Sequence, residues 1–264
     1  MKRYAVKIYY DGKNFYGFQF QKDKRTVAGE ICSALLKSRL IENLQEALFQ
    51  AASRTDRGVS ALGQTIAFNT KETFSLKRLN AFFPDEIQAW AWVEVPLNFN
   101  PRREAKLRTY VYVYPYGGEN LELMSRAAKI LQEKLVFGSY VGRNGGIYPK
   151  TLKELKVKLK GKNIFLTFSS KSFVRGLIRK LVTLLIKIGR EEIDLNQFKQ
   201  FLEARSLELN LPLASPENLI LLDIKYRFRF NVDIESKKRL IDKLKKEVCL
   251  AELKRICLEK IEKL

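Results

Sequence analysis

The chain has 264 residues, of which 46% are hydrophobic, and Lys and Arg outnumber Asp and Glu by 49 to 29, giving a formal net charge of +20. It contains no histidine, which excludes Ser-His-Asp catalysis, Cys-His catalysis and any zinc site with histidine ligands. A field this positive attracts polyanions, so nucleic acid is the expected class of partner.

The cysteines and the apolar runs indicate the environment in which the chain works. Cys32, Cys249 and Cys257 are odd in number and lack a C-x-x-C spacing, so we expect free thiols in a reducing compartment and no metal site. The longest apolar runs, such as residues 219–222, are far too short to cross a membrane. We therefore expect a soluble, cytoplasmic protein with no membrane contact.

Strand and helix patterns alternate in the N-terminal part of the chain. Residues 4–10 alternate as a half-buried strand and end at the turn pair Asp11-Gly12, whereas residues 27–40 carry apolar side chains at helical spacing. The other elements expected here are strands at 44–52 and 64–70, a short helix at 75–83 that stops before a proline, and a strand at 87–95. The order β-α-β-β-α-β is typical of a ferredoxin-like unit.

The second part of the chain repeats this order loosely. The expected elements are a strand at 106–114, a helix at 121–135, strands at 153–160 and 163–169, helices at 173–188 and 194–205, and a closing strand at 219–228. We therefore predict an α+β protein with mainly antiparallel sheets, in which two ferredoxin-like (RRM-like) halves, residues 1–104 and 105–230, enclose a basic central cleft. Residues 231–264 are expected to form a charged helical tail.

The segment with the most unusual chemistry is the polar loop around Asp56. Arg54 and Arg57 flank this carboxylate, and nearby guanidinium charge favours its ionised form. An ionised aspartate is a competent nucleophile toward a sugar carbon. The alternative from the residues alone is a loop salt bridge before the turn at Gly58.

Residues 53–68 read S-R-T-D-R-G-V-S-A-L-G-Q-T-I-A-F. This string resembles the signature G-R-T-D-x-G-V-H-A-x-G-Q-x-x-x-F of the TruA family of tRNA pseudouridine synthases. Further segments of the chain match the family in order and with similar spacing; they are residues 10–21, 84–87, 99–105, 108–112, 177–182 and 214–221. The resemblance covers residues 3 to about 230, and the R-T-D-R-G loop is its most specific part.

The resemblance implies three catalytic residues. Asp56 would be the catalytic group that attacks the ribose C1′ or removes a 2′ proton, and the sequence leaves both open. Tyr110 would stack on the target base and take its C5 proton, whereas Tyr112 and Tyr114 on the same strand face are expected in the core. Arg179 would keep Asp56 ionised and fill the space of the extruded base. A lone arginine in an apolar helix requires a carboxylate or phosphate partner on physical grounds as well.

The resemblance also implies the substrate and the assembly. The family acts on uridines in the anticodon stem-loop of tRNA, at positions 38–40, without cofactor or metal, and as a homodimer. A target base must leave its stack to reach an aspartate, which costs least in a loop. The expected phosphate contacts are Arg54, Arg57, Arg102 and Arg103, with Lys22 and Arg25 as candidates for which a solvated surface position is an equal alternative.

The chain departs from the family pattern at several positions, among them Thr183 and Asn218 in place of glycines and the poorly matching region 135–150. Ser60 and Asn100 stand where the family usually has histidine.

Two other classes of function also compete with this interpretation. A catalytically silent RNA-binding protein with RRM-like halves would need the K/R-G-F-x-F strand, which this sequence lacks. A ribosome-associated structural protein would explain the net charge of +20 but not Asp56 between two arginines.

Overall fold

The computed structural model describes residues 1–141, 147–203 and 211–261. The strands are β1 (Lys2–Tyr10), β2 (Gln50–Ala51), β3 (Ser60–Thr70), β4 (Ile87–Val95), β5 (Leu107–Pro115), β6 (Val136–Val141), β7 (Ile147–Thr151), β8 (Glu154–Lys160), β9 (Asn163–Ser170), β10 (Leu219–Lys225) and β11 (Asn231–Val232). The helices are α1 (Val27–Lys37), α2 (Leu44–Ala47), α3 (Leu76–Asn80), α4 (Pro101–Glu104), α5 (Leu121–Lys134), α6 (Leu177–Gly189), α7 (Leu195–Glu203) and α8 (Ile234–Ile261), with a 3₁₀ turn, η1, at Pro216–Asn218.

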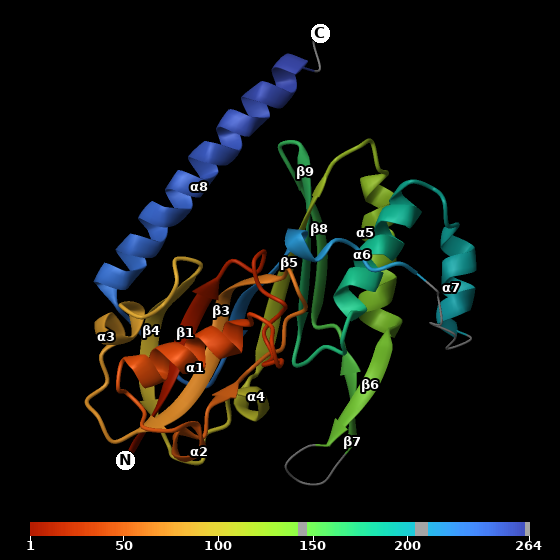
Figure 1. The fold of residues 1–264 in the computed structure, drawn as a ribbon. Coiled ribbons are helices and arrows are strands. Elements are labelled where there is room, and N and C mark those ends of the chain that lie inside the picture. The colour runs from red at the N-terminus through yellow and green to blue at the C-terminus, as the bar shows by residue number, and fades with distance from the viewer. Residues whose placement is uncertain (142–146, 204–210, 262–264) are drawn as a thin grey trace.

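One large sheet runs through the described part of the molecule (Figure 1). Its strands follow the order β11-β4-β1-β3-β10-β5-β9-β8, with β2 paired to β3, while β6 and β7 form a separate hairpin. Neighbours on this path are antiparallel except β3 and β10, which pair in parallel. The predicted α+β class with a mainly antiparallel sheet is confirmed.

The two faces of this sheet follow from the alternation in β1. Tyr4, Val6, Ile8 and Tyr10 lie in one large core together with buried residues of α1, α5 and α6. The opposite face, where Ala5 lies, is covered by residues 226–230, which we call the aromatic strap. The candidate site described below lies on the helix-covered face, because Tyr10 and Tyr110 both belong to its core.

The prediction of a strand at 44–52 is wrong for most of this segment. Residues 44–47 form α2, because the Asn43 side chain caps the helix by accepting a hydrogen bond from the backbone N–H of Glu46. Leu48 then ends the helix in a left-handed conformation, with φ at 44°. Only Gln50–Ala51 pairs with β3 as a strand. In contrast, the strand at 87–95 is confirmed with the expected bounds.

Two boundaries in the second part also differ from the sequence prediction. The helix expected at 173–188 begins only at Leu177, because Gly176 before it has φ at +74°, a left-handed value. The strand expected at 219–228 ends at Lys225, where the chain leaves β10 for the aromatic strap. The last residues of the helix expected at 194–205 lie outside the described residues, and α7 accounts for 195–203. The β6–β7 hairpin and α4 were not expected from the sequence.

Lys7 shows how tightly the strap is attached. Its ammonium lies 2.7 Å from Asp223 Oδ1 and donates to the carbonyl of Ile224, with the ring of Phe230 5.1 Å away. Burial lowers the pKa of this lysine, and the carboxylate beside it opposes that shift. Tyr226 and Phe228 stack with their ring centroids 5.3 Å apart. The strap is thus held by the buried ammonium of Lys7 and by contacts among its own aromatic rings.

Residues 234–261 of the expected charged helical tail form α8, whereas Asn231–Val232 pair with β4 as β11, and residues 262–264 are not described. Figure 1 shows α8 projecting from the body beside α3 and β4. Leu240 is buried where the helix leaves the body, whereas Val248, Leu253 and Leu258 are exposed along its outer part. Among the described residues, no helix has both the length and the apolar character that a membrane span requires.

Candidate active site

Asp56 lies in the loop that joins β2 to β3, and two arginines hold its carboxylate. Arg179 donates from Nη1 to Oδ2 at 3.3 Å, and Nε of Arg175 lies 3.4 Å from Oδ1. Both arginines come from the beginning of α6 or the turn just before it, in the other part of the chain. The Asp56 side chain remains 24% exposed, so a substrate can reach the carboxylate from solvent.

The flanking arginines of the loop do not make these contacts. The guanidinium of Arg57 lies over the ring of Tyr16, 4.5 Å from its centroid, and Arg54 is exposed. The charge beside Asp56 is therefore supplied by Arg175 and Arg179 instead of its sequence neighbours. This corrects the expectation that Arg54 and Arg57 provide it.

Arg179 is held in place from two sides. Its Nε donates to the backbone carbonyl of Ala214 at 2.6 Å while Nη1 reaches Asp56, and its side chain is only 14% exposed. The segment containing Ala214 leads through η1 into β10, which pairs with β5. The buried arginine in the apolar helix thus has the carboxylate partner that its burial requires.

The loop around Asp56 is supported from behind by the turn that follows β1. The hydroxyl groups of Tyr10 and Thr55 are hydrogen-bonded at 2.8 Å, and the backbone N–H of Phe18 donates to the carbonyl of Thr55. Gly17 has φ at +94°, and a Cβ there would lie 3.1 Å from the Thr55 carbonyl oxygen. Only glycine allows this turn to approach the loop so closely, which explains why the two motifs occur together.

Tyr110 projects from β5 toward the same loop. Its hydroxyl is hydrogen-bonded to Oγ of Ser53 at 2.8 Å, and its ring contacts Phe173 edge-on with centroids 5.4 Å apart. Burial raises the pKa of Tyr110, so the phenol is neutral near pH 7. The structure thus brings Asp56, Arg179 and Tyr110 to one place, as the sequence analysis expected.

The sequence analysis missed two arginines at this site. Buried Arg108 donates to the carbonyls of Ala52 at 2.7 Å, Arg102 at 3.0 Å and Lys171. It therefore ties the catalytic loop to α4 and to the segment before α6. Its position two residues before Tyr110, on the same face of β5, was the available signal. Arg175 carried no such signal, because its contact with Asp56 depends on the packing of distant segments.

The remaining predicted substrate contacts lie on the surface around the site. Arg102 and Arg103 are exposed on α4, where Oδ1 of Asn100 accepts hydrogen bonds from both of their backbone N–H groups at 3.0 Å. This capping explains why Asn100 can replace the histidine usual in the family. Ser60, the other residue at a position where the family usually has histidine, accepts a hydrogen bond from the backbone N–H of Gly12 through its Oγ.

Of the two weaker candidates, Lys22 is exposed, whereas Arg25 already has acidic partners. Its Nη1 lies 3.0 Å from Glu86 Oε1 and its Nε lies 2.9 Å from Glu30 Oε1. The hydrogen bond from Arg25 lowers the pKa of Glu86 to about 2. Arg25 therefore ties the loop before α1 to the start of β4, which favours the structural alternative for this residue.

The Arg25–Glu86 pair predicts a pH-dependent contribution to stability. The folded-state pKa of Glu86 is about 2 against 4.5 in its unperturbed form, so the pair stabilises the fold above about pH 4.5 and loses this effect as pH falls toward 2. We expect Glu86→Gln to lower the free energy of unfolding at pH 7 by about 1 kcal/mol, given screening by solvent. Urea denaturation at pH 7 and pH 3 measures this, and an equal deficit at both pH values would contradict it.

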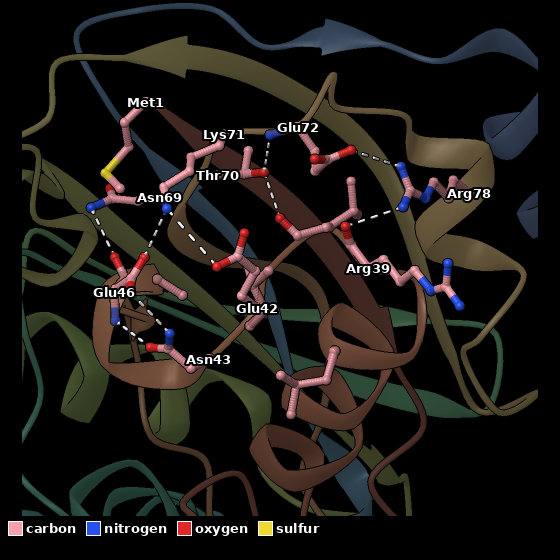
Figure 2. Close-up of a pocket in the computed structure, with 14 residues that line it drawn as sticks. Met1, Arg39, Glu42, Asn43, Glu46, Asn69, Thr70, Lys71, Glu72 and Arg78 are labelled. Carbon is pink, nitrogen blue, oxygen red and sulfur yellow. Dashed lines mark hydrogen bonds and ion pairs between the residues drawn. The ribbon is translucent and has the colours of Figure 1, made fainter.

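A pocket of about 650 Å³ lies away from this site, between α2, the end of α1 and the end of β3 (Figure 2). Its charged groups pair with one another: Lys71 lies 3.3 Å from Glu46, and Arg78 lies 3.7 Å from Glu72. None of its lining residues belongs to the loop that carries Asp56. Among the described residues, no group of three or more Cys, Asp and Glu side chains is arranged to hold a metal ion.

Comparison with known proteins shows the family of the chain. A family model described as tRNA pseudouridine synthase matches residues 136–227. Three curated proteins named tRNA pseudouridine synthase A are similar over most of their length. The protein from Methanosphaera stadtmanae is 31% identical over 96% of this chain and 94% of its own. Those from Archaeoglobus fulgidus and Thermococcus sibiricus are 34% and 36% identical, over 86% and 93% of this chain and 84% and 91% of their own.

The mainly antiparallel α+β fold and these matches place the chain among the pseudouridine synthases, which are isomerases. With matches of this extent, the chain belongs to the tRNA pseudouridine synthase A family.

Proposed function

We propose that this protein converts uridine to pseudouridine in tRNA, with Asp56 as the catalytic group. The observation that carries the proposal is the paired carboxylate of Asp56, which is partly exposed, fixed by Arg179 and close to the segment that bears Tyr110. The alternative is a salt bridge that only stabilises the loop. Such a salt bridge would not explain why Arg179, from another part of the chain, is also held by the carbonyl of Ala214.

The reaction breaks the N1–C1′ glycosidic bond, turns the uracil and joins its C5 to C1′, after which C5 loses a proton. Asp56 assists the first step by attacking C1′ or by removing a 2′ proton, and both routes use its ionised form. Arg179 holds the carboxylate in place through its ion pair with Oδ2. Tyr110 takes the C5 proton as its phenolate and becomes a neutral phenol, while N1 of the uracil ends protonated; the hydrogen bond to Ser53 orients the Tyr110 oxygen.

We propose the anticodon stem-loop, at positions 38–40, as the target. A base in or beside a loop costs least to extrude into a site at this depth. The net charge of +20 and the exposed arginines 54, 57, 102 and 103 around the loop support a path for the phosphate backbone. The test is to incubate the purified protein with unmodified tRNA and to map pseudouridine by position. Failure to form it in any tRNA would reject the proposed activity.

Arg102 and Arg103 give a quantitative prediction about this path. The logarithm of the tRNA association constant should fall linearly with the logarithm of salt concentration, with a slope of roughly −0.7 to −0.9 per phosphate contact. Arg102→Ala and Arg103→Ala should each reduce the magnitude of this slope by about one contact. Binding titrations over a salt series measure it. If both variants keep the wild-type slope, the RNA does not pass over α4.

The domain boundaries, the assembly and the cellular location are proposed from three further observations. We propose two ferredoxin-like halves, residues 1–104 and 105–230, with a basic cleft between them, because the loop of one and α6 of the other meet at Asp56. The homodimer is supported by the exposed apolar side chains along α8, which a second copy would cover. Light scattering in solution measures its mass. We propose a cytoplasmic location, because the free thiols of Cys32, Cys249 and Cys257 are typical of a reducing compartment.

A further inference from the structure

The two arginines that contact Asp56 differ in how firmly they are held. Arg179 is 14% exposed and is also bound to the carbonyl of Ala214 at 2.6 Å, whereas the side chain of Arg175 is 93% exposed. Among the described residues, Arg175 forms its ion pair with Asp56. An ion pair with so exposed a partner contributes little to stability, so Arg175 can leave Asp56 at little cost.

The segment that carries Arg175 also covers Tyr110. Phe173, two residues earlier, contacts the Tyr110 ring at 5.4 Å between centroids, and Tyr110 is only 6% exposed. A base that is to stack on Tyr110 must therefore displace Phe173 and the residues up to Gly176, while Lys171 stays bound to Arg108. The turn at Gly176, with φ at +74°, separates this segment from α6, so the segment can shift without moving Arg179.

From these contacts we infer that Arg175 exchanges partners when RNA binds: its guanidinium leaves Asp56 and pairs with a backbone phosphate next to the extruded nucleotide. The inference rests on the proposed function and adds a residue to it. Entry of the target frees Oδ1 of Asp56 for the sugar, and the polyanion that enters offers the cation a replacement partner. Arg179 stays on Oδ2 throughout, because Ala214 holds it. The two arginines thus have separate roles, one fixed and one transferable.

The first test compares Arg175→Gln and Arg175→Lys with wild type in binding unmodified tRNA over a salt series. Arg175→Gln should reduce the magnitude of the salt slope by roughly 0.7 to 0.9 and weaken binding about fivefold at physiological salt. Arg175→Lys should keep the wild-type slope. The matched control is Arg227→Gln, an exposed arginine in the strap on the opposite face of the sheet, which should change neither quantity. A wild-type slope in Arg175→Gln would overturn the inference.

A double-mutant cycle tests the exchange itself. In Asp56→Asn, Arg175 has no ion pair to break before it contacts a phosphate. This variant should therefore bind tRNA more tightly than the wild-type protein does. This gain should be clearly smaller in Arg175→Gln than in the wild-type background. An equal gain in both backgrounds would show that the lost negative charge acts directly on the RNA, and the exchange would be rejected.

Kinetics separate the inference from a role in catalysis and from the proposed function. At limiting tRNA, the single-turnover rate of Arg175→Gln should fall only in proportion to its affinity, about fivefold, whereas Arg227→Gln should keep the wild-type rate. A large fall in that rate with an unchanged salt slope would mean that Arg175 acts through Asp56, and would overturn the inference. Absence of pseudouridine with the wild-type protein would reject the proposed function instead, while active wild type with an unchanged slope rejects only the role of Arg175.

Discussion

Asp56→Asn should reduce pseudouridine formation below detection, a loss of at least about 10⁴-fold. The amide keeps the size and shape of the side chain but removes the ionised oxygen that either attacks C1′ or accepts the 2′ proton. Arg179 would lose its charged partner, yet its hydrogen bond to the carbonyl of Ala214 remains. The measurement is single-turnover formation of pseudouridine in unmodified tRNA, with tRNA binding recorded in parallel.

Binding and folding decide how that result is interpreted. The Asn variant should still bind tRNA, because the phosphate contacts proposed for arginines 54, 57, 102 and 103 do not involve Asp56. Asp85→Asn is the matched control: Asp85 is an exposed carboxylate in the loop before β4, and its replacement should leave the rate unchanged. Pseudouridine made by the Asn variant at a rate near wild type would remove Asp56 from the mechanism.

Sequence alone predicted the parts of the fold that depend on local pattern. The alternation of residues 87–95 and the proline before them fixed the bounds of β4. The strand at 44–52 failed because the Asn43 cap and the left-handed Leu48 outweigh the apolar character of the segment. The late start of α6 has a similar cause: an apolar run continues through Phe173, but Gly176 does not adopt a helical φ.

The residues of the candidate site could be predicted from sequence motifs, but the partners of its charged groups could not. Asp56, Tyr110 and Arg179 lie in motifs that a single sequence displays, and the burial cost of Arg179 already required an anionic partner. The partners of the charged groups could not be predicted, because they are set by packing between distant segments. Arg57 turns to the ring of Tyr16, Arg25 to Glu86, and Arg175 takes the place beside Asp56 that sequence proximity suggested for Arg57.

Tyr110→Phe should lower the rate by about 10² to 10⁴, the usual range for a positioned acid or base. The ring stays, so stacking worth about 1 to 3 kcal/mol per base is kept and tRNA binding should be nearly normal. What is lost is the hydroxyl that now bonds to Ser53 Oγ at 2.8 Å. The measurement is single-turnover release of tritium from C5-labelled tRNA.

Neighbouring tyrosines provide the control for this variant. Tyr112 is buried, and the half-buried Tyr114 accepts a hydrogen bond from Arg190 at 2.6 Å. Phe at either position should leave the rate within a few-fold of wild type. A rate for Tyr110→Phe equal to these controls would make the Tyr110 hydroxyl structural and assign the C5 proton to another group or to water.

The raised pKa of Tyr110 predicts how the rate of the reaction changes with pH. Burial raises the pKa of Tyr110 above its ordinary value of 10, so the phenolate that accepts the proton is scarce at neutral pH and increases as pH rises. With proton removal limiting, the logarithm of the wild-type rate should rise by about one per pH unit between roughly pH 7 and pH 9, without levelling. Tyr110→Phe should lose this rise, whereas Tyr112→Phe should keep it. A wild-type rate that is flat over this range would contradict removal of the proton by the Tyr110 phenolate.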